Sequence, residues 1–150
     1  MRVFSVFVLS IVAIASPVAA SGPSNPMTAV HQFIDGLNTN HIPLALAACA
    51  PETSIIDEFA PYSWHGPGAC ATWARAFGAE AKKDGMSDPF VTLGAAKHTD
   101  ITTTHAYVVV PAKYTFKVHG RVASESAATM TFALVKTSGW HIVAWTWSKP

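Results

Sequence analysis

Apolar residues recur at helical spacing in three segments of the first half of the chain. In the first segment they are Val30, Phe33, Ile34 and Leu37. Intervals of three and four residues place them on one face of a helix, which we expect to begin near Met27 and to loosen at Gly36 and Asn38. An Ala- and Leu-rich segment from Pro43 to just before Pro51 predicts a second helix. A third is predicted over residues 69–83, with Cys70, Trp73, Ala74 and Phe77 on one face.

The second half of the chain has the residue pattern of β-strands. We predict strands over 90–96, 105–119, 121–135 and 140–147, and a short β-branched strand over 53–59. The segments 119–121 and 137–139 are short enough to close antiparallel hairpins. Helices followed by hairpin-linked strands predict an α+β fold, with a strongly bent mixed or antiparallel sheet packed on three N-terminal helices.

Alternation within two strands predicts which faces are buried. In the strand over 105–119, one face carries Val108, Val110, Ala112, Tyr114, Phe116 and Val118, and we expect it to turn toward the helices. Pro111 predicts a bulge or a sheet edge within this strand. The last strand is apolar on both faces, with Trp140 and Ile142 on one and Trp145 and Trp147 on the other. This favours a covered outer sheet face and hence a homodimer.

The first twenty residues have the layout of a secretory signal peptide. Arg2 precedes an apolar run, and small residues lead to Ala20, where we expect cleavage. Residues 21–26 are then a linker and 27–150 one domain, secreted or periplasmic, with no stable membrane insertion after cleavage. Half of the residues are apolar, which excludes intrinsic disorder. The formal net charge of +1 gives no basic surface for nucleic acid.

Cys49 and Cys70 are the only two cysteines in the sequence. Export permits a disulfide between them. Two separate buried thiols are an equally good interpretation, because sequence alone gives no pairing geometry.

Asp57 is the leading candidate for proton transfer. It lies among Ile55, Ile56 and Phe59, with Glu58 beside it, and only one of two neighbouring strand carboxylates can enter an apolar interior. Burial there would raise its pKa, which suits a general base or acid. We expect His65 and Tyr62 to assist it. The alternative is structural: Asp57 satisfies a backbone N–H or reaches solvent, and His65 satisfies loop backbone.

Other chemistries find little support in the sequence. The closest pairing of histidine with an acid, His98-Thr99-Asp100, lies in a Thr-rich segment expected to be a solvated loop, so we expect no metal site. Residues 66–71 match G-x-G-x-x-A, but the strands that follow have no crossover helices, so we expect no dinucleotide and no other cofactor.

The order of elements resembles the nuclear transport factor 2-like superfamily, and within it the SnoaL-like or ketosteroid-isomerase-like group. The resemblance also includes Trp64-His65-Gly66 before the third helix and Gly139-Trp140-His141-Ile142 in the last strand. It implies a cone-shaped sheet around an apolar cavity, often in a dimer. The fold alone does not fix an activity, because that superfamily spans several reactions and plain binding modules.

Ketosteroid isomerases in that group place their general-base Asp nine residues before a helix-opening glycine, as Asp57 stands before Gly66 here. Their helix-one Tyr corresponds to Phe33, which has no hydroxyl, and the segment 129–131 lacks their late-strand acid. Without such oxyanion donors, steroid isomerisation by that mechanism is disfavoured.

Two functions follow as hypotheses. In the first, a cavity binds a small, largely apolar molecule, with acid/base chemistry of an isomerase, dehydratase or hydrolase type. Its expected lining is Phe33, Trp64, Trp73, Phe77, Tyr114, Phe116, Phe132 and Trp145, which could equally be ordinary core. In the second, the chain is a non-catalytic dimerisation or protein-interaction module. A pocket faced by Asp57 and His65 favours the first, and a filled interior with Trp145 or Trp147 exposed favours the second.

Overall fold

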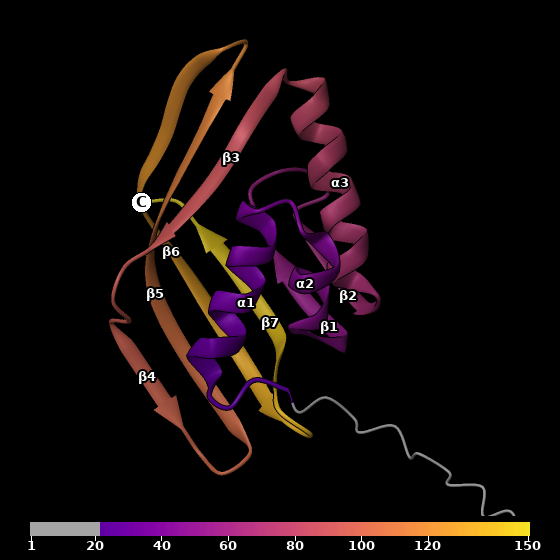
Figure 1. Ribbon diagram of the computed structural model, residues 1–150, viewed down its shortest axis with the longest axis vertical. Helices are drawn as coiled ribbons and strands as arrows, with labels where there is room; N and C mark the ends of the chain where they lie inside the picture. Colours follow the sequence, from indigo (N-terminus) through magenta and orange to yellow (C-terminus); the bar gives the residue numbers. More distant parts are fainter. Residues whose placement is uncertain (1–21) are drawn as a thin grey trace, which may run out of the picture.

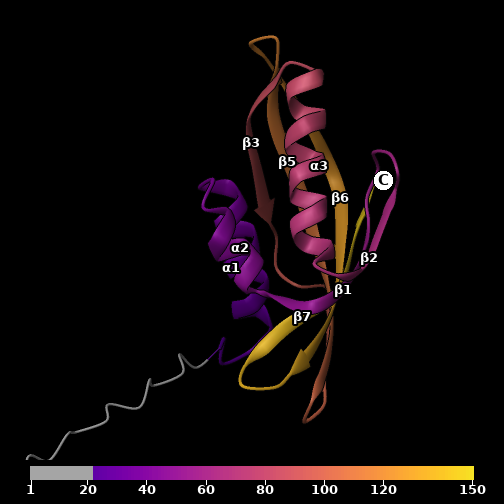
Figure 2. The same cartoon turned by 90° about the vertical axis from the view of Figure 1, so that its right-hand side faces the viewer.

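The computed structural model describes residues 22–150, in which three helices pack against a seven-stranded sheet (Figures 1 and 2). The predicted signal peptide lies outside the described residues. In chain order the elements are α1 (Pro26–Asn38), α2 (Ile42–Ala47), β1 (Cys49–Ile56), β2 (Ser63–Pro67), α3 (Ala69–Lys83), β3 (Met86–Leu93), β4 (His98–Ile101), β5 (His105–Val118), β6 (Arg121–Lys136) and β7 (Trp140–Ser148).

The sheet is mixed and open, with strand order β2-β1-β7-β6-β5-β3. β1 runs parallel to β7, and every other pairing is antiparallel. β3 and β4 pair with successive parts of the same edge of β5. Figure 1 shows α1 crossing in front of the sheet and α3 standing beside β3. The predicted α+β class, with a mixed sheet packed on three helices, is confirmed.

Two strands were not predicted. β2 contains Gly66 and Pro67, which we expected to form a tight turn, and it pairs with β1 from Glu52 to Ile56. β4 covers the segment expected to be a solvated loop, and all four of its residues are exposed. Neither strand has an apolar alternation, so backbone pairing with a neighbour determines each of them.

A bulge in β7 explains why that strand is apolar on both faces. The register with β6 shifts between Ala133 and Leu134, which leaves one extra residue, Val143, on β7. A bulge reverses the alternation beyond it, so Trp140 before the bulge and Trp145 after it are both buried in the core. The apolar residues of β7 therefore do not argue for a covered outer face.

A second bulge lies in β6, opposite Ala112 and Tyr114 of β5. Ala127 in this bulge has a positive φ of 63°. The extra residue places Glu125 opposite Tyr114, on the side of the sheet that also carries the buried Met130. A carboxylate thereby reaches the helix-facing side of the sheet.

Asn38, expected to weaken the end of α1, instead ties that helix to β3. Its side-chain Nδ2 donates to the carbonyl oxygen of Val91 at 2.8 Å, and its Oδ1 accepts from the Val91 N–H at 2.7 Å. The side-chain amide thus hydrogen-bonds both backbone polar groups of Val91 on the edge strand β3, and this holds the end of α1 over the sheet.

Cys49 and Cys70 form a disulfide that joins the start of β1 to the first turn of α3. Buried side chains of α1, α3 and the inner sheet face complete the core, and Val108, Val110, Ala112 and Tyr114 are buried as predicted. Within residues 22–150, no helix is long and apolar enough to span a bilayer.

Candidate functional site

A cavity of about 440 Å³ lies between α1, α3, β3 and the inner face of the sheet. Its aromatic lining consists of Phe33, Phe59, Trp73, Phe77, Phe90, Tyr114, Trp145 and Trp147. Its acidic lining consists of Asp57, Glu58, Glu80 and Asp84. This combination of a largely apolar wall with a few polar groups is typical of small-molecule sites.

Asp57 directly follows β1 and is the deepest of these carboxylates, with 9% of its surface exposed. Its Oδ2 accepts a hydrogen bond from Trp73 Nε1 of α3 at 2.7 Å. Its Oδ1 accepts from the backbone N–H of Glu58 at 2.8 Å. Both oxygens are therefore held in place by the protein.

Burial raises the pKa of Asp57 from 3.8 to about 6, because the charged form loses its hydration. The Trp73 hydrogen bond opposes this shift by favouring the carboxylate, while the charge of Glu125 reinforces it and that of Lys149 opposes it. A carboxyl group with this pKa is largely ionised at neutral pH and can still exchange a proton readily.

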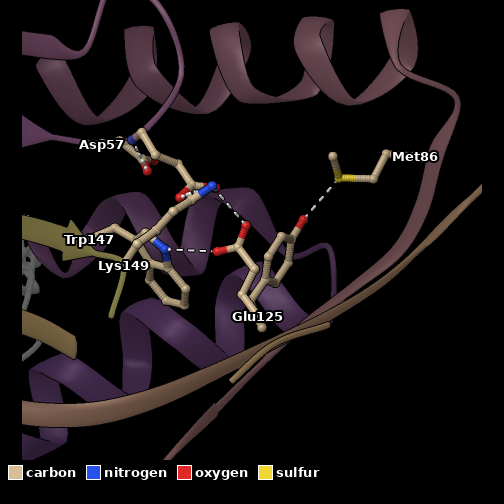
Figure 3. Close-up of polar contacts among 7 residues, drawn as sticks. Asp57, Met86, Glu125, Trp147 and Lys149 are labelled. Carbon is tan, nitrogen blue, oxygen red and sulfur yellow. Dashed lines mark hydrogen bonds and ion pairs between the residues drawn. The ribbon is translucent and has the colours of Figure 1, made fainter. Parts of the chain in front are cut away.

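Lys149 connects two acids beside the cavity (Figure 3). Its Nζ lies 3.0 Å from Glu58 Oε2 and 3.4 Å from Glu125 Oε1. Trp147 Nε1 donates to the other oxygen of Glu125 at 3.2 Å. The Lys149 side chain is 58% exposed, so this cluster lies at the solvent side, whereas Asp57 is buried.

Tyr114 closes another part of the wall. Its hydroxyl donates to Met86 Sδ at 3.1 Å (Figure 3). Burial raises the pKa of Tyr114 to about 12, with the charges of Glu125 and Asp57 adding to the effect. The phenol therefore stays neutral at physiological pH.

His65 and Tyr62 do not join Asp57. His65 directly follows the buried Trp64 on β2. Because neighbouring strand residues point to opposite sides, the His65 side chain is turned away from the core and is exposed to solvent. Tyr62 has a positive φ of 70° and is 61% exposed. Neither lines the cavity, so the expected assistance to Asp57 has no geometric basis.

The predicted aromatic residues divide into two groups. Those that line the cavity are Phe33, Trp73, Phe77, Tyr114 and Trp145. Phe132 is fully buried in the core, Trp64 packs on Phe59 with ring centroids 4.9 Å apart, and Phe116 stacks on Tyr114 at 4.6 Å. None of these three reaches the cavity.

Sequence reasoning missed Glu125, Trp147 and Lys149 as parts of the site. The bulge in β6 determines the side on which Glu125 lies, and the bulge in β7 does the same for Trp147. No signal in the sequence marks either bulge strongly. In the part of the chain from 22 to 150, no group of three or more His, Cys, Asp and Glu side chains could hold a metal ion.

Comparison by sequence finds no matching protein-family model and no matching curated protein. Comparison by structure finds many similar chains. A putative calcium/calmodulin-dependent protein kinase type II association domain from Thiobacillus denitrificans aligns with a TM-score of 0.66 and 18% identity, over 88% of this chain and 99% of that one.

Two further neighbours carry family names. A ketosteroid isomerase-like protein from Erwinia carotovora atroseptica has a TM-score of 0.65 and 16% identity, over 83% of this chain and 92% of that one. A nuclear transport factor 2-like superfamily protein from Salmonella enterica has a TM-score of 0.67 and 17% identity, over 81% of this chain and 86% of that one. The TM-scores of these alignments, each over more than four fifths of this chain, show that this chain has the nuclear transport factor 2-like fold.

Proposed function

We propose that the chain binds a small, largely apolar molecule in its cavity and that Asp57 exchanges a proton with it. The observation that carries this proposal is a cavity of about 440 Å³ with aromatic walls and one deeply buried carboxylate. Pockets for small molecules combine this kind of volume with few, well-placed polar groups. The fold is also one that ligand-binding and catalytic domains share.

Asp57 suits the role of proton acceptor. Its carboxylate is oriented by Trp73 and by the Glu58 backbone, so proton transfer requires no rearrangement of the acid. With a pKa of about 6, it is ionised in most molecules at neutral pH. Such a group fits isomerisation, dehydration or hydrolysis, and the absence of a hydroxyl at Phe33 argues against steroid isomerisation by the oxyanion mechanism.

The alternative of a pure docking module required a filled interior with Trp145 or Trp147 exposed. Instead, Trp145 is 2% exposed and Trp147 is partly buried, and both line the cavity. We therefore favour ligand binding over docking through these tryptophans.

Filling the cavity should prevent binding. Ala74 lies on the cavity-facing side of α3, and Ala74→Phe places an aromatic ring in the space that a ligand would occupy. We expect tetralin, a bicyclic hydrocarbon, to bind the unmodified protein and to bind this variant at least roughly tenfold more weakly. Isothermal titration calorimetry measures both affinities.

Ala79→Phe is the matched control, because Ala79 lies on the same helix but is exposed and does not line the cavity. Its affinity for tetralin should equal that of the unmodified protein. Equal weakening by both substitutions, or no binding to the unmodified protein, would contradict the proposed site.

We also propose that the domain is exported and works as a homodimer. The Cys49–Cys70 disulfide supports export, since such bonds persist in oxidising compartments. The dimer proposal rests on the resemblance to a superfamily whose members often form dimers, and the apolar residues of β7 do not support it. Native mass spectrometry of the exported protein would show both the loss of residues 1–20 and the number of subunits.

A further inference from the structure

The charged residues that line the cavity are all of one sign. Four of them are carboxylates, and none of the described lining residues is a lysine, arginine or histidine. Two exposed lysines outside the lining, Lys149 and Lys83, each pair with one of these acids, Glu58 and Glu80 respectively. A cavity whose charged groups share one sign favours the entry of ligands of the opposite sign.

Asp57 is a buried charge with no cation in contact with it. It is ionised in most molecules at neutral pH, and it forms no ion pair with a described residue. Its two hydrogen bonds come from neutral groups, Trp73 Nε1 and the backbone N–H of Glu58. An ionised carboxylate can accept more than two hydrogen bonds, and buried charges in proteins are usually paired. Asp57 therefore lacks the cation that a carboxylate in such a position normally has.

The acids next to Asp57 already hold an ammonium group. Lys149 Nζ bridges Glu58 and Glu125, and Figure 3 shows that Asp57, Lys149 and Glu125 lie close together. This lysine approaches from solvent, and its side chain is not part of the cavity lining. The carboxylates at this end of the cavity are thus arranged so that they can bind an ammonium, and Asp57 and Glu58 are the two that line it.

Indole rings in the same wall favour the same chemistry. Trp73, Trp145 and Trp147 all line the cavity together with the carboxylates. A cation is attracted to the face of an aromatic ring, and tryptophan gives the strongest attraction. The wall therefore combines apolar surface for the body of a ligand with groups that stabilise a positive charge.

We propose that the cavity prefers an apolar molecule that carries an ammonium group over neutral and anionic molecules of the same shape, and that the charges of Asp57 and Glu58 select it. This inference deepens the proposed function and depends on it. Attraction between charges acts over several ångströms in a poorly hydrated cavity, so it does not require contact with every carboxylate oxygen. The carboxylates and the indole rings replace the water that the ammonium loses on entry.

The test compares three probes of nearly the same shape: 2-aminotetralin, tetralin and tetralin-2-carboxylate. At pH 7.5 the first is a cation, the second is neutral and the third is an anion. We expect the unmodified protein to bind 2-aminotetralin roughly tenfold more tightly than tetralin, and tetralin-2-carboxylate most weakly. Isothermal titration calorimetry measures the three affinities.

Three substitutions should change the preference in opposite directions. Asp57→Asn and Glu58→Gln each remove a negative charge and should weaken the binding of 2-aminotetralin, with little change for tetralin. Lys149→Gln removes the positive charge beside these acids and should strengthen the binding of 2-aminotetralin roughly threefold. Glu58 and Lys149 are exposed residues, so their variants keep the test decisive if Asp57→Asn does not fold.

Glu52→Gln and Lys97→Gln are the matched controls. Each removes one charge from an exposed residue that does not line the cavity. Both variants should bind all three probes as the unmodified protein does.

Each outcome bears on the proposal. A preference for 2-aminotetralin that falls in Glu58→Gln and rises in Lys149→Gln supports it. Equal binding of 2-aminotetralin and tetralin, or a preference for the carboxylate probe, overturns it while leaving the cavity proposal intact. A preference for the cation that none of the three substitutions changes also overturns it, because the named charges then do not select the ligand. Failure of all three probes to bind overturns this inference together with the proposed function.

Discussion

Replacing Asp57 with asparagine is expected to remove a pH-dependent loss of stability of about 3 kcal/mol. The pKa of Asp57 is about 6 in the folded chain and 3.8 as the ordinary value for the unfolded chain. Between these values the folded state binds the proton more tightly than the unfolded state. The contribution of Asp57 to stability is therefore complete below pH 3.8 and is lost as pH rises through 6.

The measurement is the free energy of unfolding in urea at pH 4 and at pH 7.5, for the unmodified protein and for Asp57→Asn. The difference between the two proteins should change by about 2.5 kcal/mol across this interval, most of the full effect, in favour of the variant at the higher pH. Asparagine cannot accept both hydrogen bonds of Asp57, so the variant also carries a constant penalty, which cancels in this comparison.

Glu52→Gln is a suitable control, because Glu52 is an exposed carboxylate on β1, the strand that Asp57 directly follows. Its stability difference from the unmodified protein should stay nearly constant across the same interval. Parallel pH curves for Asp57→Asn and the unmodified protein would show that Asp57 is not held in an unfavourable charged state. Asp57→Asn should also abolish any turnover that requires Asp57 to take a proton.

Removing the disulfide by Cys49→Ala together with Cys70→Ala should lower the free energy of unfolding by about 3 kcal/mol. The bond closes a loop with a sequence separation of 21 residues, which contains all of β2 and the Asp57 segment. In the chain-entropy account, a loop of this length restricts the unfolded state by about that amount. Urea unfolding at one fixed pH gives the value.

The unmodified protein in reducing buffer should match the double variant, since both lack the same cross-link. A loss well below 1 kcal/mol in both would mean that β1 and α3 are positioned without the bond. If the free energy of unfolding fell in the double variant but not when the disulfide of the unmodified protein was reduced, the effect would instead come from packing of the two sulfur atoms.

The sequence predicts the parts of this fold that a repeating apolar pattern determines. The stripe on α1 and the alternation of β5 each bury most of the residues expected, for example Phe33 and Val110, while Leu37, Phe116 and Val118 are only partly buried. The sequence does not predict β2 and β4, because each of them forms by backbone pairing with a neighbouring strand. A local pattern of apolar residues carries no information about such pairing.

The site was predictable to a similar extent. Asp57 stands out because it is an acid among large apolar residues, and the structure buries it. His65 was favoured for the pKa range of imidazole, but which side of a strand a residue occupies depends on register, and β2 turns it outward. Glu125 is polar in a polar stretch, so nothing in its neighbourhood indicates that it faces inward.

The extra residue at Val143 has a consequence for tracing the ancestry of this chain. Every position after it has exchanged inside for outside relative to an uninterrupted strand. An alignment that places no gap there would match Trp145 and Trp147 with solvent-facing positions of a relative lacking the insertion. An alignment of the last strand with such a relative should therefore allow a gap at this point.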